Sequence, residues 1–236
     1  MTSSSRAVLR RRPQLSEEVA GHLRHLIMTG AIRPGEFIRM DETAVDLQVS
    51  VTPVREALLT LRGEGMVNLA PHRGYVVAEL TRQDVEDIFW LQGVLAVELA
   101  VRISKTVTPE QLDELSELNN QLKATIASGR PADVAAAEFE FHRVHNRIAD
   151  GGKLAWFLLN ATRYTPQDLY ASDPQWGEVA CESHAKLIEA YRNGDRDEVV
   201  TQTRRQFTDG AERLTRHLES VGLWADDTID EASSES

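Results

Sequence analysis

The hydrophobic period of the chain changes near residue 81. Beyond Thr81 no segment alternates like a strand, and apolar residues recur instead at the i, i+3, i+4 and i+7 spacing of a helix face. Such stripes run along 88–103, 112–126 and 134–148, and the pattern predicts further helices over about 153–171, 175–193 and 195–220. Six helices with short connections are typical of an antiparallel bundle. We therefore expect residues 81–222 to form an all-α domain.

The segment before residue 81 has a different order of elements. The sequence predicts a helix from Leu15, an extended piece in 33–38, a short helix near 41–47, a helix from Ser50 and a hairpin in 66–80. This is the order of a winged helix-turn-helix, to which we assign residues 14–80. The predicted fold class is therefore mainly α, an N-terminal winged helix-turn-helix plus a C-terminal antiparallel all-α helical bundle.

The two ends of the chain differ in composition from both domains. Residues 1–13 are rich in Ser and Arg, which predicts a flexible basic arm. Residues 225–236 are acidic and nearly devoid of apolar side chains, and we assign residues 223–236 to a disordered acidic tail.

Charge is distributed unevenly along the chain. The net charge is −11, but residues 1–80 carry 10 Arg, no Lys and 9 acidic residues, whereas the remainder carries 16 basic and 28 acidic residues. An arginine-bearing, nearly neutral front suits a DNA-reading module attached to another domain. No apolar run reaches the roughly 18 residues of a membrane span, and the single cysteine, Cys181, is interpreted as a packing residue. We expect a cytoplasmic protein with no membrane partner.

Residues 50–57, SVTPVREA, have the residue types that a DNA-reading helix needs at its start. The second helix of a helix-turn-helix places its first residues against base edges in the major groove. Ser50 and Thr52 supply short polar side chains there, and Arg55 can reach a guanine or a phosphate. The predicted hairpin turn adds three wing residues near the minor groove: His72, Arg73 and Gly74. The alternative interpretation is that Arg55 is a solvated helix residue, with or without a nearby acidic partner, and that the hairpin has no role in DNA binding.

The run VSVTPVREALLTLRGEGMVNLAPHRGYVV resembles the winged-helix signature of GntR-family transcriptional regulators. FEFHRVHNRIADGGKL (139–154) and SHAKLIEAYRNGD (183–195) resemble the FadR-type branch, whose C-terminal all-helical (FCD) domain senses a ligand and dimerises. The resemblance implies a homodimeric repressor or activator, and no enzyme. Such a dimer would bind a short palindromic DNA operator and change its affinity when a small metabolite binds.

Val51 departs from the pattern of the resembled family, which usually has Arg directly after the serine. One base-reading guanidinium is therefore absent from the helix. We predict a different operator, with Val51 available for apolar contact with a thymine methyl group.

Glu138, His142 and His145 lie at i, i+4 and i+7 on one predicted helix, where an acid and a His can bind one metal ion from a single face. The resemblance implies a divalent-metal site, for zinc or a nickel-like ion, built from a carboxylate, this His and two later His. His184 matches the first of those two, whereas Gln206 stands where the second is expected. Gln92 stands where the family often has an arginine for the carboxylate of the effector.

These departures leave two interpretations of the helical domain open. The histidines are hydrogen-bonded core residues, or Glu138, His142 and His184 form a weakened metal site that His145 or a water molecule completes. Because Gln92 carries no charge, a larger or more apolar effector is favoured over a small hydroxy acid. Two alternative functions are a helical metalloenzyme and a DNA-binding dimer that takes no ligand.

Overall fold

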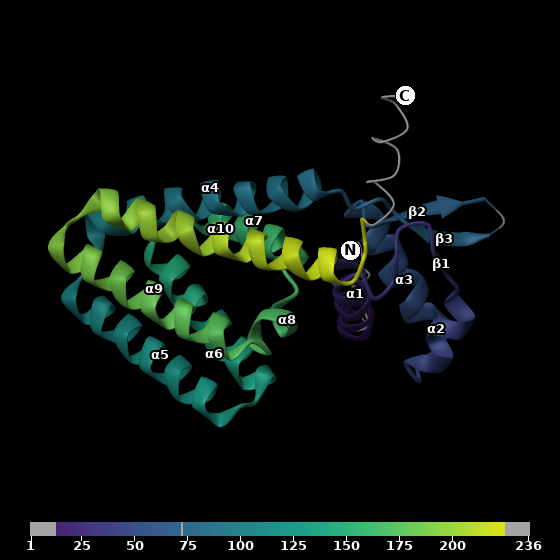
Figure 1. The fold of residues 1–236 in the computed structure, drawn as a ribbon, viewed down its shortest axis with the longest axis horizontal. Coiled ribbons are helices and arrows are strands. Elements are labelled where there is room, and N and C mark those ends of the chain that lie inside the picture. Colours follow the sequence, from purple (N-terminus) through teal and green to yellow (C-terminus); the bar gives the residue numbers. More distant parts are fainter. Residues whose placement is uncertain (1–12, 72, 225–236) are drawn as a thin grey trace, which may run out of the picture. The chain divides into compact units, whose positions relative to one another are not determined.

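The computed structural model of the chain describes residues 13–71 and 73–224 (Figure 1). The chain divides between Glu79 and Leu80 into two compact units. We call these the DNA-binding unit and the helical unit. Within the described residues, no helix is both long enough and apolar enough to cross a membrane.

The DNA-binding unit is a winged helix-turn-helix, as the sequence predicts. Its elements are α1 (Pro13–Met28), β1 (Phe37–Ile38), α2 (Met40–Asp46), α3 (Val51–Gly63), β2 (Val67–Ala70) and β3 (Gly74–Val77). The three strands form an antiparallel sheet in the order β1-β3-β2, with Val67 opposite Val77 and Ala70 opposite Gly74. Buried Val54, Leu58 and Leu61 line the inner face of α3, so its remaining faces are left to solvent.

A buried ion pair joins the first and third helices of this unit. The Arg24 guanidinium donates two hydrogen bonds to the Glu64 carboxylate, at 2.8 and 2.9 Å. Only 7% of the Arg24 side chain and 16% of the Glu64 side chain are exposed. The pair therefore ties the end of α3 to α1 inside the unit.

The helical unit consists of seven α-helices and one short 3-10 helix within the described residues. They are α4 (Arg82–Thr106), α5 (Pro109–Ser128), α6 (Pro131–Ile148), α7 (Gly152–Ala161), η1 (Thr162–Tyr164), α8 (Gln167–Ala171), α9 (Pro174–Asn193) and α10 (Arg196–Ser220). Long helices lie side by side in pairs, α4 with α10 and α5 with α9 (Figure 1). Thr81 and Thr108 begin α4 and α5 with capping boxes that satisfy otherwise unpaired backbone amides.

Two expectations for the helical unit are wrong in detail. The single helix expected over 153–171 is broken, because Pro166 disfavours helical backbone at Thr165, which is extended (φ −87°, ψ 118°). The expected tail starts too early, because the packed unit continues to Trp224. This side chain is 8% exposed, and its indole donates to the Leu80 carbonyl at 2.7 Å.

The N-terminal boundary also differs from the expectation, because α1 begins at Pro13, the last residue of the expected arm. Proline fits the first turn of a helix, where its missing N–H breaks no bond. The rest of the expected arm, residues 1–12, and the tail from residue 225 lie outside the described residues.

Candidate functional sites

The first turn of α3 presents polar side chains that have no partner in the described structure. Ser50 is the N-cap residue, with extended backbone (φ −75°, ψ 163°), but its hydroxyl makes no capping hydrogen bond. Thr52 and Arg55 are exposed, whereas Pro53 and Val54 between them are buried. Within the described residues Arg55 forms no ion pair, and its exposure is compatible both with DNA reading and with the alternative of a solvated helix residue. The hydrogen-bonding capacity of this turn is available to an external ligand.

The wing ends in a tight turn between β2 and β3. Gly74 has φ +98°, a conformation that glycine adopts without steric cost, and the Arg73 amide donates to the Ala70 carbonyl at 3.0 Å. The side chain of Arg73 is exposed. His72 lies outside the described residues.

The helical unit encloses a cavity of about 660 Å³. Side chains from six helices line it, on α4, α6, α7, α8, α9 and α10. Its aromatic lining residues are Phe89, Phe139, Trp156, Tyr170, Trp176 and Phe207. A cavity of this size and lining is typical of a small-molecule site.

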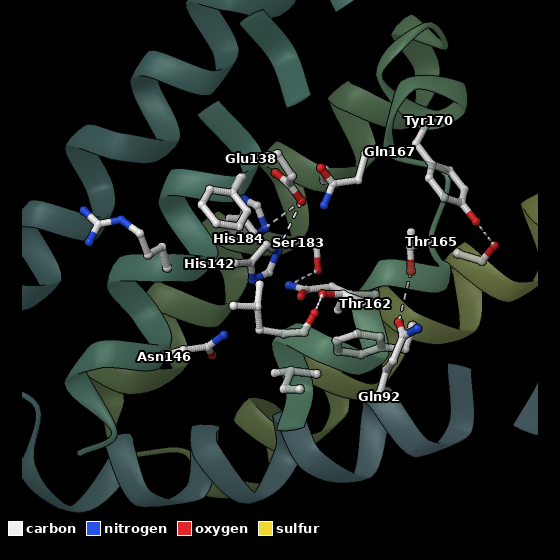
Figure 2. A pocket seen from close by; sticks show the side chains of 18 of the residues that line it. Gln92, Glu138, His142, Asn146, Thr162, Thr165, Gln167, Tyr170, Ser183 and His184 are labelled. Atoms are coloured by element: carbon white, nitrogen blue, oxygen red, sulfur yellow. Dashed lines mark hydrogen bonds and ion pairs between the residues drawn. The ribbon is translucent and has the colours of Figure 1, made fainter. Parts of the chain in front are cut away.

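Three side chains in this cavity point toward one another (Figure 2). Glu138 Oε1 lies 3.2 Å from His142 Nε2 and 3.7 Å from His184 Nε2. The three residues can each offer a ligand atom within 4.8 Å of the other two. The second carboxylate oxygen, Glu138 Oε2, is buried without a hydrogen-bond partner in the described structure. A buried carboxylate oxygen without a partner fits a cation better than a self-sufficient hydrogen-bonded core.

The protonation states of this cluster also suit a metal ion. Burial lowers the pKa of His184 to about 4, although Glu138 opposes the shift. Burial alone would raise the pKa of Glu138, but His184 and His142 outweigh it, and the resulting pKa lies below the ordinary value. Near pH 7, His184 is therefore neutral and Glu138 is charged, which are the forms that bind metal.

Two family models match the chain. One is described as bacterial regulatory proteins, gntR family, and matches residues 15–77; the other is the FCD domain and matches residues 87–209. The chain belongs to the GntR family. It is a transcriptional regulator of that family with a C-terminal FCD domain.

Relatives along most of the chain have related descriptions. The chain is 26% identical to the HTH-type transcriptional repressor RspR of Escherichia coli, covering 88% of this chain and 87% of that one. It is 24% identical to the gluconate operon transcriptional repressor of Bacillus licheniformis, over 81% of each. Among solved structures, Escherichia coli McbR/YncC matches with a TM-score of 0.65 at 22% identity, covering 86% of this chain and 97% of that one. This last likeness concerns the fold.

His145 does not join the cluster, contrary to one interpretation of the sequence. It is 4% exposed, and its Nε2 lies 2.8 Å from the Tyr191 hydroxyl on α9. The i+7 spacing from Glu138 places it near the same helix stripe, but a partner 46 residues away draws the ring into the core. In this GntR-family chain the cluster therefore consists, among the described residues, of three side chains that could hold a metal ion: Glu138, His142 and His184.

The two glutamines, Gln92 and Gln206, both line the cavity. Gln206 Nε2 donates to Ser183 Oγ at 3.2 Å, so its amide is held beside the cluster by a hydroxyl of α9. Gln92 is 1% exposed; it donates to the Ala161 carbonyl at 3.0 Å and accepts from the Thr165 hydroxyl at 3.3 Å (Figure 2). The sequence reasoning missed Ser183 and Thr165, because no local pattern distinguishes them from other small polar residues.

Proposed function

We propose that this regulator binds a palindromic DNA operator as a homodimer and represses transcription, and that a small metabolite in the cavity changes its affinity for DNA. The observation that carries the proposal is the start of α3, where Ser50, Thr52 and Arg55 have no internal partner. Solvated polar groups at the start of a second helix-turn-helix helix are the groups that read base edges and phosphates. Repression is proposed because two relatives along most of the chain are named repressors.

The homodimer is proposed because two recognition helices related by a two-fold axis match a palindrome. The helical unit offers apolar surface for this contact. Trp90, Leu91 and Val94 on α4 are 68%, 45% and 47% exposed, and Trp156 and Phe157 on α7 are each more than half exposed. Large exposed apolar side chains of this kind mark association surfaces. Light scattering tests the assignment: a monomeric native protein contradicts it, and Trp90→Glu should weaken the dimer.

The metal site is proposed from the donor set and the buried, unpartnered oxygen of Glu138. Glu138, His142 and His184 would hold a divalent ion such as zinc or nickel, which supplies a Lewis acid to an oxygen or nitrogen donor of the effector. Gln206 is a poor ligand, so we expect weaker binding than with a fourth His. Neutral Gln92 and the aromatic wall favour an effector with a large apolar part.

The DNA-binding proposal is tested with duplex DNA from the promoter region of the protein itself. We expect an electrophoretic shift at low salt and a change of preferred operator in Val51→Arg, since this variant adds one guanidinium to the reading turn. Gln121→Arg, at an exposed position of α5 in the helical unit, adds the same charge and is the control for the change in net charge. Absence of a shift, or an unchanged preference in Val51→Arg, contradicts the corresponding part of the proposal.

The metal proposal has an independent test that needs no DNA. Elemental analysis and titration with Ni²⁺ should find one ion per chain in the native protein. Glu138→Gln should weaken metal binding more than about 100-fold. Loss of a residue that only hydrogen-bonds a metal ligand lowers metal affinity by about 10- to 100-fold, and loss of a direct ligand should lower it further. One ion per chain in both proteins with equal affinity would show that Glu138 is not a ligand, and absence of metal from the native protein would favour the dimer that takes no ligand.

A further inference from the structure

The C-terminal turn of α10 folds back onto the first residues of the helical unit. Gly222 has φ +71° and its amide donates to the Glu219 carbonyl at 2.9 Å, while the Leu223 amide donates to the Leu218 carbonyl at 2.9 Å. This pair of hydrogen bonds is a Schellman motif, which ends a helix and reverses the chain through a left-handed residue. Trp224, the next described residue, is thereby directed toward the start of α4.

Three contacts hold the start of α4 against this turn. The Trp224 indole donates to the Leu80 carbonyl at 2.7 Å, in a buried position. The Arg82 guanidinium lies 4.6 Å from the centroid of the Trp224 ring, in the geometry of a cation–π contact. Arg82 also pairs with Glu219. We call Leu80, Arg82, Glu219 and Trp224 the linker clamp.

The linker clamp lies where the helical unit joins the DNA-binding unit along the chain. Leu80 is the first residue of the helical unit, so the chain passes directly from the clamp into the DNA-binding unit. The same helix that ends in the clamp also lines the cavity, through Gln206, Phe207 and Gly210. From Gly210 to Glu219 is nine residues of one continuous helix, or about 14 Å at the helical rise. A rigid element thus joins the cavity wall to the linker.

The α4–α10 contact at the cavity has little spare room. A Cβ atom added at Gly210 would lie 2.7 Å from Phe89 Cε1, and the Tyr170 hydroxyl donates to the Gly210 carbonyl at 2.8 Å. Phe89, Tyr170 and Gly210 all line the cavity. A ligand that displaces Gly210 would therefore shift α10 relative to α4, because close-packed interfaces do not deform continuously.

We propose that the linker clamp couples the cavity to operator affinity, by transmitting a displacement of α10 against α4 to the segment that leads into the DNA-binding unit. The proposal rests on the proposed function, since it assigns the route by which cavity occupancy would regulate DNA binding.

The test replaces the unidentified effector with a substitution. Gly210→Ala places a Cβ atom 2.7 Å from Phe89 Cε1, so the Phe89 ring or α10 has to move, and the variant serves as a displacement at the α4–α10 contact that needs no ligand. Trp224→Leu removes both the hydrogen bond to Leu80 and the ring that Arg82 contacts. The affinity of native protein, each single variant and the double variant is measured for a duplex that the native protein selects from random DNA. Gly93→Ala is the matched control, since its added Cβ would meet Phe207 Cβ at an ordinary 3.6 Å.

We expect Gly210→Ala to change operator affinity by about fivefold or more, and this effect to be lost in the Trp224→Leu background. Gly93→Ala should leave affinity unchanged. Equal effects of Gly210→Ala in both backgrounds, or no effect in either, would overturn the coupling. If native protein selects no sequence, the proposed function itself fails, which is a different result. Should Gly210→Ala not fold, Tyr170→Phe releases α10 at the same carbonyl and takes its place in the cycle.

Discussion

The first turn of α3, which we propose reads DNA, and the Glu138 cluster are built in opposite ways. At the start of α3, the polar side chains are solvated and have no partners within the described residues. In the cluster, His184 is 1% exposed and the Glu138 carboxylate lies against two imidazoles. DNA is a long, charged and solvated polymer, so the groups that bind it can be exposed side chains on a rigid helix. A small ligand instead needs groups that the fold has already desolvated and oriented.

The largest predicted effect concerns the buried Arg24–Glu64 ion pair of the DNA-binding unit, which differs from the solvated polar groups of α3. Arg24→Ala leaves the Glu64 carboxylate without its bidentate partner, which should cost about 3–5 kcal/mol in the stability of the unit. Hydrogen exchange of α1 and α3 measures the loss. Arg39→Ala is the control, because the Arg39–Glu42 pair is about 70% exposed on both sides and should contribute nothing measurable. Equal protection in Arg24→Ala and the native protein would contradict the prediction.

The second prediction concerns the buried histidines and pH. Burial lowers the pKa of His145 to about 3 and that of His184 to about 4. Between pH 6.5 and about 4, the unfolded chain therefore binds protons that the folded unit does not. Stability of the helical unit should fall as pH falls through this window, by about 1.4 kcal/mol per pH unit for each histidine.

Tryptophan fluorescence measures this loss in the helical unit alone, since all four tryptophans lie between residues 90 and 224. Urea unfolding at pH 7, 6 and 5 gives the slope of the free energy of unfolding against pH. His145→Gln removes one titrating group and can still hydrogen-bond the Tyr191 hydroxyl, so its slope should be about half as steep. A slope that does not depend on position 145 would assign the pH dependence to other groups.

The same contrast explains what the sequence could predict. The α3 turn is contiguous, so a cap, a proline in the first turn and one arginine indicate its geometry. The i, i+4 spacing of Glu138 and His142 likewise predicts their proximity. His184 is expected beside them only from the family resemblance, and the structure places it there from α9. The orientation of His145 depends on Tyr191, and that of Gln92 on Ala161 and Thr165. Such contacts between distant segments leave no local pattern.

The third prediction tests whether the exposed side chain of Arg55 on α3 contacts a DNA base. Arg55→Ala should weaken binding to the selected operator by about 5- to 150-fold and relax preference at one base position, as expected for a lost bidentate contact. Metal content of the helical unit should not change. Arg102→Ala removes the same charge from the helical unit and should leave operator binding intact. A uniform loss across all DNA sequences would reassign Arg55 to a phosphate.

The smallest expected effect on DNA affinity comes from Arg73 in the wing, and it distinguishes the role of the wing from that of the recognition helix α3. Arg73 is exposed in the turn before Gly74, where a cation contacts phosphates rather than bases. Arg73→Gln should weaken selected and unrelated duplexes alike and lower the slope of log K against log salt concentration by about one. Arg55→Ala alters sequence preference, whereas Arg73→Gln should alter only salt dependence. If Arg73→Gln instead changed the preferred sequence, base reading would extend to the wing, and the minor groove would carry part of the specificity.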